Sequence, residues 1–164
     1  MWKCETLLGR KSFLVVIFEK RCKEIVRNMN ILIVDGQGGQ LGAQLIKEIT
    51  ARYPEVQITA VGTNATATAA MLKAGAKKAA TGENPVVVAC RKADVIIGPI
   101  GIVVADSMYG EVTPQMAVAV GQADAVRILI PMNRCENLIA GVQEITMSEM
   151  LADVLSKVDK IVKN

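Results

Sequence analysis

The sequence contains no histidine, and its four cysteines (Cys4, Cys22, Cys90 and Cys135) are widely spaced without a CxxC pair. Structural zinc sites are built from closely spaced Cys and His ligands, so we expect no metal site. Free thiols without a disulfide framework are typical of a reducing compartment. The cysteine pattern therefore predicts a cytoplasmic protein.

Aromatic residues and long apolar runs are also scarce. Aromatic residues make up 3% of the 164 residues, and only Tyr53 and Tyr109 lie after residue 28. Two rings are too few for a surface on which nucleic-acid bases stack. The longest apolar runs, such as residues 13–18, span about six or seven residues, whereas a membrane-spanning helix needs roughly 20. We therefore expect no nucleic-acid partner and no membrane span.

Positive charge is concentrated at the start of the chain. Residues 1–28 carry seven Lys and Arg against three Glu, a net charge of +4, while the rest of the chain carries −1. The apolar run in this segment resembles a signal peptide but is short, is followed by charged residues and lacks a small-residue cleavage site. Met29 directly precedes an apolar run. We interpret residues 1–28 as an N-terminal extension with a misassigned start, the alternative being an ordinary helix or strand packed on the domain.

From residue 29 to residue 164, short apolar runs alternate with helix-like stretches. The pattern predicts strands at residues 31–34, 56–61, 76–81, 95–98 and 126–130, with a final edge strand at 138–142. Helices are predicted at residues 41–50, 64–74, 85–92 and 115–120, and a terminal helix follows the capping box of Thr146 and Glu149. This alternation is typical of a parallel sheet with crossover helices. The predicted fold class is α/β, a Rossmann-like three-layer α/β/α domain with a mainly parallel sheet.

A glycine-rich segment follows the first predicted strand and opens the first helix. It comprises Asp35, Gly36, Gln37, Gly38, Gly39, Gln40, Leu41 and Gly42. Gly36 suits a tight turn, Gly39 lets the backbone approach a pyrophosphate, and Gly42 lets the helix pack closely on the sheet. The amides and dipole of a helix start favour an anion. We therefore predict a cofactor-binding turn; the alternative is a turn that binds nothing.

The carboxylate of Asp35 does not suit a bare phosphate, because the two would repel each other. It can instead bind a ribose hydroxyl or a magnesium ion, or stay neutral or paired within the fold.

Three further loops follow predicted strands at the edge where open α/β sheets bind ligands. The cofactor-binding residues predicted there are Gly62, Thr63 and Asn64 after the second strand and Gly98, Pro99, Ile100 and Gly101 after the fourth. The predicted substrate-binding residues are Asp106, Ser107, Tyr109, Asn133 and Arg134. Arg134 can clamp a phosphate or carboxylate that Asn133 orients. Surface turns that bind nothing are the alternative for residues 106–109.

The turn Gly36-Gln37-Gly38-Gly39-Gln40-Leu41-Gly42 resembles the cofactor loop of extended short-chain dehydrogenases, which implies binding of NAD or NADP. The resemblance covers the first strand, turn and helix. No Asp or Glu ends the second strand, where such an acid holds the ribose 2′-hydroxyl. The YxxxK motif of those enzymes is also absent, since Gln57 and Thr113 stand four residues after the two tyrosines. Their dehydrogenase chemistry is therefore not carried over.

Beyond residue 29 the chain is similar throughout to an uncharacterised family of short bacterial Rossmann-like proteins. The similar segments are residues 33–42, 62–64, 80–84, 98–101 and 130–135. The resemblance implies the fold and supplies no activity.

Three functions remain open from the sequence. The first is a dinucleotide-binding protein that acts as a homodimer, and the apolar face of its terminal helix is interpreted as core or as the dimer interface. Cys135 is interpreted as an ordinary thiol because the sequence has no histidine to serve as its base; the alternative is a reactive thiol assisted by Arg134. The second is a non-catalytic sensor of a nucleotide or other anionic metabolite. The third is a structural scaffold that works through a partner. The first two hypotheses both predict that a small nucleotide-like ligand binds at residues 36–42.

Overall fold

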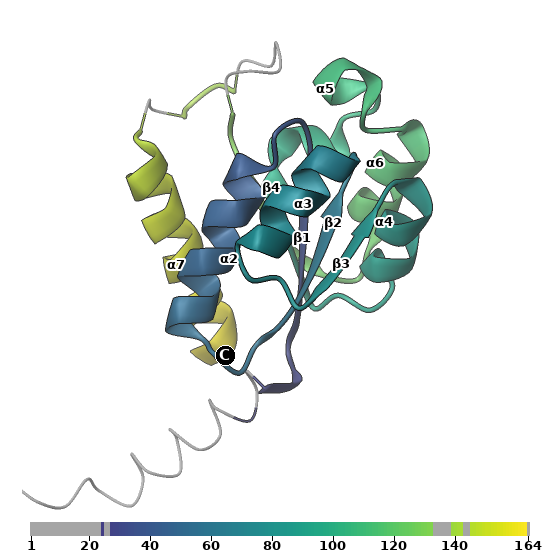
Figure 1. Ribbon diagram of the computed structural model, residues 1–164. Coiled ribbons are helices and arrows are strands. Elements are labelled where there is room, and N and C mark those ends of the chain that lie inside the picture. Colours follow the sequence, from purple (N-terminus) through teal and green to yellow (C-terminus); the bar gives the residue numbers. More distant parts are fainter. Residues whose placement is uncertain (1–23, 25–26, 133–138, 143–144, 164) are drawn as a thin grey trace, which may run out of the picture.

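A single parallel sheet organises the computed structural model, which describes residues 24, 27–132, 139–142 and 145–163 (Figure 1). Its strands are β1 (Asn30–Asp35), β2 (Gln57–Gly62), β3 (Lys78–Thr81), β4 (Val95–Pro99) and β5 (Val126–Ile130). Their spatial order is β3-β2-β1-β4-β5, and every neighbouring pair is parallel. The predicted α/β fold class is confirmed.

Strand β1 lies at the centre of the sheet and is buried on both faces. Ile31 and Ile33 enter one hydrophobic core, while Leu32 and Val34 enter the other. Each of these four side chains is at most 2% exposed. A continuous β-branched or aliphatic run suits such a strand, because both sets of alternating side chains meet apolar neighbours.

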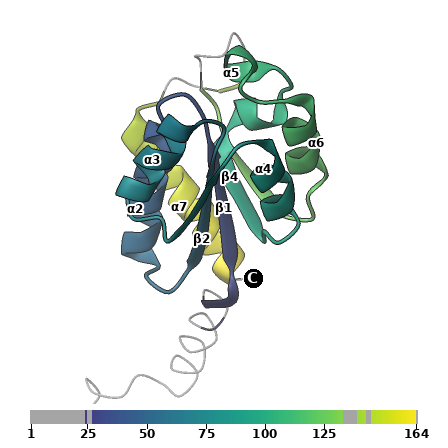
Figure 2. The same ribbon diagram turned by 45° about the vertical axis from the view of Figure 1, so that its right-hand side comes forward.

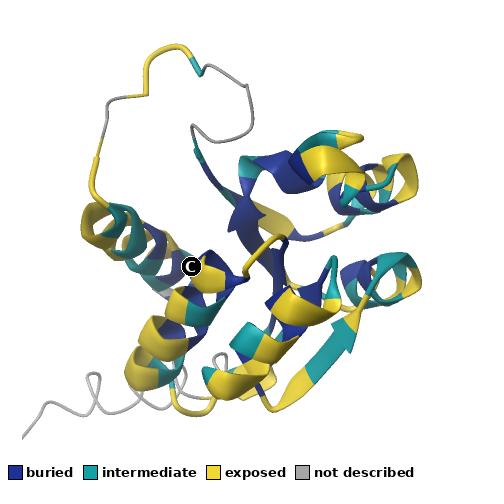
Figure 3. Ribbon diagram, turned by 45° about the horizontal axis from the view of Figure 1, so that its top comes forward, coloured by how far each residue is buried: buried dark blue, intermediate teal, exposed yellow. Residues whose placement is uncertain are grey.

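Helices cover both faces of the sheet and complete three layers (Figure 2). Helices α2 (Gln40–Arg52), α3 (Ala65–Lys73) and α7 (Met147–Lys163) cover one face. Helices α4 (Glu83–Cys90) and α6 (Pro114–Gln122) cover the other, joined there by η1 (Ile100–Val103) and α5 (Ser107–Gly110). The central strands are dark blue and buried, the edge strand β3 is teal and yellow, and the outer sides of the helices are yellow and exposed (Figure 3).

The direction of the crossovers reverses between β1 and β4. From β1 the chain moves outward to β2 and β3, and α4 then carries it back to β4 and onward to β5. In open α/β sheets, ligands bind outside the carboxyl ends of the strands at such a reversal. The glycine-rich turn after β1 lies at this point of the molecule.

The helix-start signals in the sequence are largely confirmed. Thr113 caps α6 by accepting a hydrogen bond from the amide of Met116 at 3.2 Å. Thr146 and Glu149 form the predicted reciprocal capping box, with the Thr146 amide donating to Glu149 Oε2 at 2.7 Å and the Glu149 amide donating to Thr146 Oγ1 at 3.3 Å.

Two local predictions are wrong. Helix α4 begins at Glu83 instead of after Asn84, because the Val86 amide bonds the carbonyl of Gly82 and starts the helical pattern earlier. The described residues 139–142 form a turn, with the Val142 amide bonded to the Ile139 carbonyl at 3.4 Å, so the expected edge strand is absent there. Residue 138 lies outside the described part of the chain.

The apolar face of α7 belongs to the core of the same chain. Val154, Val158 and Val162 are at most 6% exposed and pack in the cluster that contains the buried side chains of α2. This face is therefore unavailable as the predicted dimer interface. The homo-oligomer stays a prediction without a defined interface.

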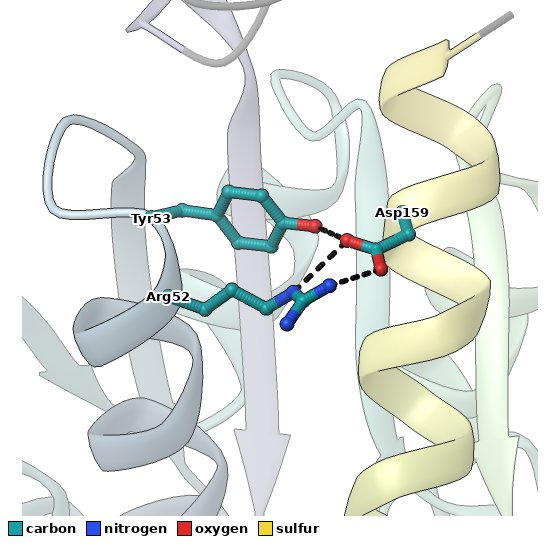
Figure 4. Close-up of polar contacts among 3 residues, drawn as sticks. All are labelled: Arg52, Tyr53 and Asp159. Atoms are coloured by element: carbon teal, nitrogen blue, oxygen red, sulfur yellow. Dashed lines mark hydrogen bonds and ion pairs between the residues drawn. The ribbon is translucent and has the colours of Figure 1, made fainter. Parts of the chain in front are cut away.

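A cluster of three polar side chains joins α7 to the C-terminal end of α2 (Figure 4). Arg52 Nε donates to Asp159 Oδ1 at 3.0 Å, and Arg52 Nη2 donates to Oδ2 of the same carboxylate. The Tyr53 hydroxyl also donates to Asp159 Oδ1. Burial and the hydrogen bond to this carboxylate raise the pKa of Tyr53, so the phenol stays a donor at neutral pH.

We expect Asp159→Asn to lower the melting temperature by roughly 2–4 °C, because Arg52 and Tyr53 lose their shared, partly buried charged acceptor. The control is Asp153→Asn on the same helix, which removes a carboxylate from an exposed pair with Lys157 and should change the melting temperature by less than about 1 °C. Thermal denaturation followed by circular dichroism measures both. Equal effects of the two substitutions would contradict a specific role for Asp159.

Candidate functional site

The turn between β1 and α2 is a short, internally bonded loop of residues 36–39. The Gly39 amide donates to the Gly36 carbonyl at 2.9 Å. Gln37 and Gly39 have φ angles of +51° and +66°, a left-handed conformation that glycine adopts at little cost and glutamine does not. The strain at Gln37 persists because its amide and its carbonyl are both held by side chains from other elements.

Gly39 and Gly38 differ in what surrounds them. A Cβ atom on Gly39 would lie 2.5 Å from the Cα of Ala67 in α3, so helix α3 requires glycine there. A Cβ atom on Gly38 would meet nothing within 4 Å. Gly38 therefore marks the open side of the turn. Gly42 has the packing role expected of it, since its Cβ would lie 2.6 Å from the sulfur of Met71.

The Asp35 carboxylate lies beneath the turn and is 5% exposed. Its Oδ1 accepts from the Gly36 amide at 2.8 Å, and its Oδ2 accepts from the Gly42 amide in the first turn of α2 at 2.7 Å. Burial raises the pKa of Asp35; the two backbone hydrogen bonds oppose this rise in part, and the charge of Glu111 adds to it. From the sequence, Asp35 could bind a ribose hydroxyl or a magnesium ion, or be neutral or paired within the fold. The structure shows Asp35 paired within the fold.

Three amides at the start of α2 remain available. Within the described part of the chain, the backbone N–H groups of Gly38, Gln40 and Leu41 donate no hydrogen bond. The first amides of a helix have no partner inside the helix and carry partial positive charge. They can therefore donate to an anionic group on the open side of the turn.

A pocket of about 250 Å³ opens at this side of the turn. Its lining residues are Asp35, Gly36, Gln37, Gly38, Gly39, Gln40, Leu41, Pro99, Met108, Met132 and Met147. The polar backbone of the turn contributes to the lining, and so do three thioether side chains from separate parts of the chain. Methionine side chains are flexible and polarisable, so they adapt to flat or irregular apolar groups. The pocket thus pairs anion-binding amides with an apolar wall.

A second carboxylate, that of Glu111, bonds both the turn and the residues that follow β2. Glu111 Oε2 accepts from the Gln37 amide at 2.8 Å, from Thr63 Oγ1 at 2.5 Å and from Asn64 Nδ2 at 2.8 Å. Burial raises the pKa of Glu111, but these three hydrogen bonds outweigh it and hold the pKa below its ordinary value. Glu111 is therefore ionised at neutral pH.

The structure brings together some of the residues predicted to bind a cofactor. Thr63 and Asn64 both bond Glu111, Asn64 also donates directly to the Gln37 carbonyl of the turn, and Pro99 lines the pocket. Asn64 also caps α3 by accepting from the Ala67 amide at 2.8 Å. Gly62 and Gly98 have backbone roles, because a Cβ atom there would collide with Thr68 or with the Val34 carbonyl. Ile100 and Gly101 form the start of η1.

Of the residues predicted to bind a substrate, the described ones (Asp106, Ser107 and Tyr109) do not line the pocket. Ser107 Oγ donates to the Gly101 carbonyl at 2.6 Å, and Tyr109 is 98% exposed. Asp106 precedes Ser107 and is not among the described lining residues; Met108 of the same loop is. Asn133 and Arg134, together with Cys135, lie outside the described residues.

The sequence patterns missed Glu111 and the three pocket methionines. Glu111 lies in a crossover far along the chain from the turn it contacts, and a single glutamate there has no distinguishing local pattern. Met132 came closest to being predicted, because it lies two residues after the predicted strand at residues 126–130 and directly before Asn133 and Arg134 in the sequence. Among the described residues, no cluster of three or more Cys, Asp or Glu side chains could hold a metal ion, and no helix has the length and apolar character to cross a membrane.

The chain belongs to a family defined by a domain of unknown function, DUF3842, whose model matches residues 30–163. The expected membership of an uncharacterised family is confirmed. No curated protein matches the chain.

The lowered pKa of Glu111 predicts a pH-dependent contribution to stability. This contribution is complete above the ordinary carboxyl pKa of 4.5 and is lost as the pH falls through the lower pKa of the folded state. Glu111→Gln should therefore show a smaller loss of stability than the wild type between about pH 5 and pH 3. Urea denaturation across this range measures the free energy of unfolding of both proteins. Parallel pH profiles would contradict a Glu111 pKa that is lower in the folded state than in the unfolded state.

Proposed function

We propose that this member of the DUF3842 family binds a nucleotide at the carboxyl edge of its sheet, either a dinucleotide of the NAD(P) type or a related phosphate-bearing molecule. One observation carries the proposal. Gly38, Gln40 and Leu41 line a pocket at the reversal of the sheet, and within the described residues nothing accepts a hydrogen bond from their amides. A ligand phosphate is the acceptor that suits helix-start amides.

The pocket walls fit the two parts of a nucleotide. The amides suit the phosphate, and the wall formed by Met108, Met132 and Met147 suits the flat apolar face of a base or nicotinamide ring. The buried Asp35 opposes a free, highly charged phosphate, because its carboxylate already compensates the Gly36 and Gly42 amides. A phosphodiester or pyrophosphate with spread charge is the better match.

A non-catalytic nucleotide or metabolite sensor is the second candidate. Asp35 is the titratable side chain among the described lining residues, and both of its oxygens are bound by backbone amides. It is therefore poorly placed as a general base. The pocket volume of about 250 Å³ is also small for a complete dinucleotide, since ligand pockets commonly span roughly 300–1,000 Å³. Binding without turnover, with similar affinity for mononucleotides, would favour the sensor.

A thermal-shift screen of the full chain with NAD, NADP, FAD, ATP, AMP and S-adenosylmethionine, with and without magnesium, tests the proposal. A ligand at 100 times its dissociation constant should stabilise the fold by about 2.7 kcal/mol, which corresponds to a shift of roughly 5–10 °C. The absence of a shift with every compound would leave the turn as a structural element and favour the scaffold.

Gly38→Leu should abolish the ligand-dependent shift while leaving the melting temperature of the free protein within about 2 °C, because the new side chain enters open space on the binding side of the turn. The matched control is Gly121→Leu in α6, where a Cβ atom also meets nothing within 4 Å. Gly39 is unsuitable for this test, since its substitution collides with α3. A full shift retained by Gly38→Leu would place the ligand elsewhere.

A further inference from the structure

We infer that Glu111 recognises the ribose of the nucleotide and selects a free 2′-hydroxyl over a 2′-phosphate. The inference rests on the proposed function and names its ligand class: NAD or an adenine mononucleotide with an intact ribose diol, and not NADP. It also identifies which residue replaces the acid missing from the end of the second strand.

The position of Glu111 carries the inference. In dinucleotide-binding α/β domains, an acid at the end of the second strand accepts from the ribose, whereas Thr63 and Asn64 follow β2 here. Both side chains donate to Glu111 Oε2, at 2.5 Å and 2.8 Å. The connection between β4 and β5 thus places the Glu111 carboxylate at the end of β2. The same oxygen lies 2.9 Å from the position of a Cβ atom on Gly36, directly against the glycine turn.

Only one of the two carboxylate oxygens of Glu111 accepts hydrogen bonds from the described residues. All three donors, from Gln37, Thr63 and Asn64, bond Oε2. Within the described residues, Oε1 accepts no hydrogen bond. An ionised carboxylate oxygen accepts from a ribose hydroxyl but repels a phosphate at the same place. The geometry therefore favours an unphosphorylated ribose.

The loop that carries Glu111 is folded to hold it there. Asp106, Met108 and Tyr109 have φ angles of +62°, +56° and +61°, and non-glycine residues adopt this conformation only when surrounding contacts compensate the strain. The compensation includes a 2.8 Å bond from the Asp106 amide to the Val112 carbonyl and the burial of Met108, which is 7% exposed. The Met108 sulfur lies near Gly36 at the end of a flexible side chain, so it can move to admit the ribose.

A purely structural Glu111 would also make these hydrogen bonds, and the two roles differ in one measurable quantity. If Glu111 only holds its loop in place, its loss weakens the binding of every nucleotide by a similar factor. Loss of a selecting charge changes the ratio of affinities between nucleotides with and without a 2′-phosphate. Glu111→Gln separates the roles, because glutamine keeps an oxygen for the three donors and removes the charge.

Isothermal titration calorimetry with two matched pairs of probes measures this ratio: NAD against NADP, and AMP against adenosine 2′,5′-bisphosphate. The wild type should bind the unphosphorylated member of at least one pair about 100-fold more tightly, because a like-charge contact is strongly unfavourable. In Glu111→Gln the preference should fall below about tenfold. Glu48→Gln, which removes the same charge from the exposed surface of α2, should retain the wild-type ratio.

Equal wild-type affinities within each pair would overturn the inference and leave the proposed function intact. If Glu111→Gln lowers both affinities by the same factor and leaves their ratio unchanged, Glu111 serves only to hold its loop in place. This result would also overturn the inference. Binding of none of the four probes would overturn the inference and the proposed function together. The wild-type ratio is decisive even where the variant folds poorly, since a preference for the phosphorylated member cannot coexist with an ionised Glu111 at the ribose.

Discussion

The buried carboxylate of Asp35 is the interaction on which the arrangement of the site depends. It ends the central strand and accepts from both Gly36, at the start of the turn, and Gly42, in the first turn of α2. One side chain therefore fixes the distance and angle between β1 and α2. Because it accepts from the Gly36 and Gly42 amides, the amides left available in the described part of the turn and helix start are those of Gly38, Gln40 and Leu41. The direction from which a ligand can approach follows from this pairing.

Glu111 constrains the same turn from outside. It holds the Gln37 amide, while Asn64 holds the Gln37 carbonyl at 3.0 Å, so the strained residue of the turn is fixed at both of its backbone groups. Two negative charges thus flank one glycine-rich loop, and the charge of Glu111 contributes to the raised pKa of Asp35. A loop flanked in this way is less suited to a free phosphate ion than to a neutral sugar joined to a diffuse phosphate charge. The electrostatics and the hydrogen-bond geometry point to the same class of ligand.

The chemistry available in the pocket is limited by the same two constraints. Its described lining combines backbone amides, Leu41, Pro99 and three methionines with a single carboxyl group that is already paired. Such a surface can bind and orient a cofactor but offers no free proton acceptor of its own. If the protein catalyses a reaction, the reactive group must come from the bound cofactor, from a substrate or from outside this lining.

The layers of the fold, the turn and most helix starts could be predicted from the sequence, because each depends on neighbouring residues: the apolar run of β1, the glycine spacing, and the caps at Thr113 and Thr146. The wrong edge strand at residues 138–142 shows the limit of this information, since an apolar run forms a strand only where a partner strand is available. Three features required the folded structure: Glu111 reaches the end of β2, three methionines line one pocket, and α7 packs on its own chain. These contacts join residues far apart in sequence, and their geometry depends on strand order and on a strained loop that no local pattern specifies.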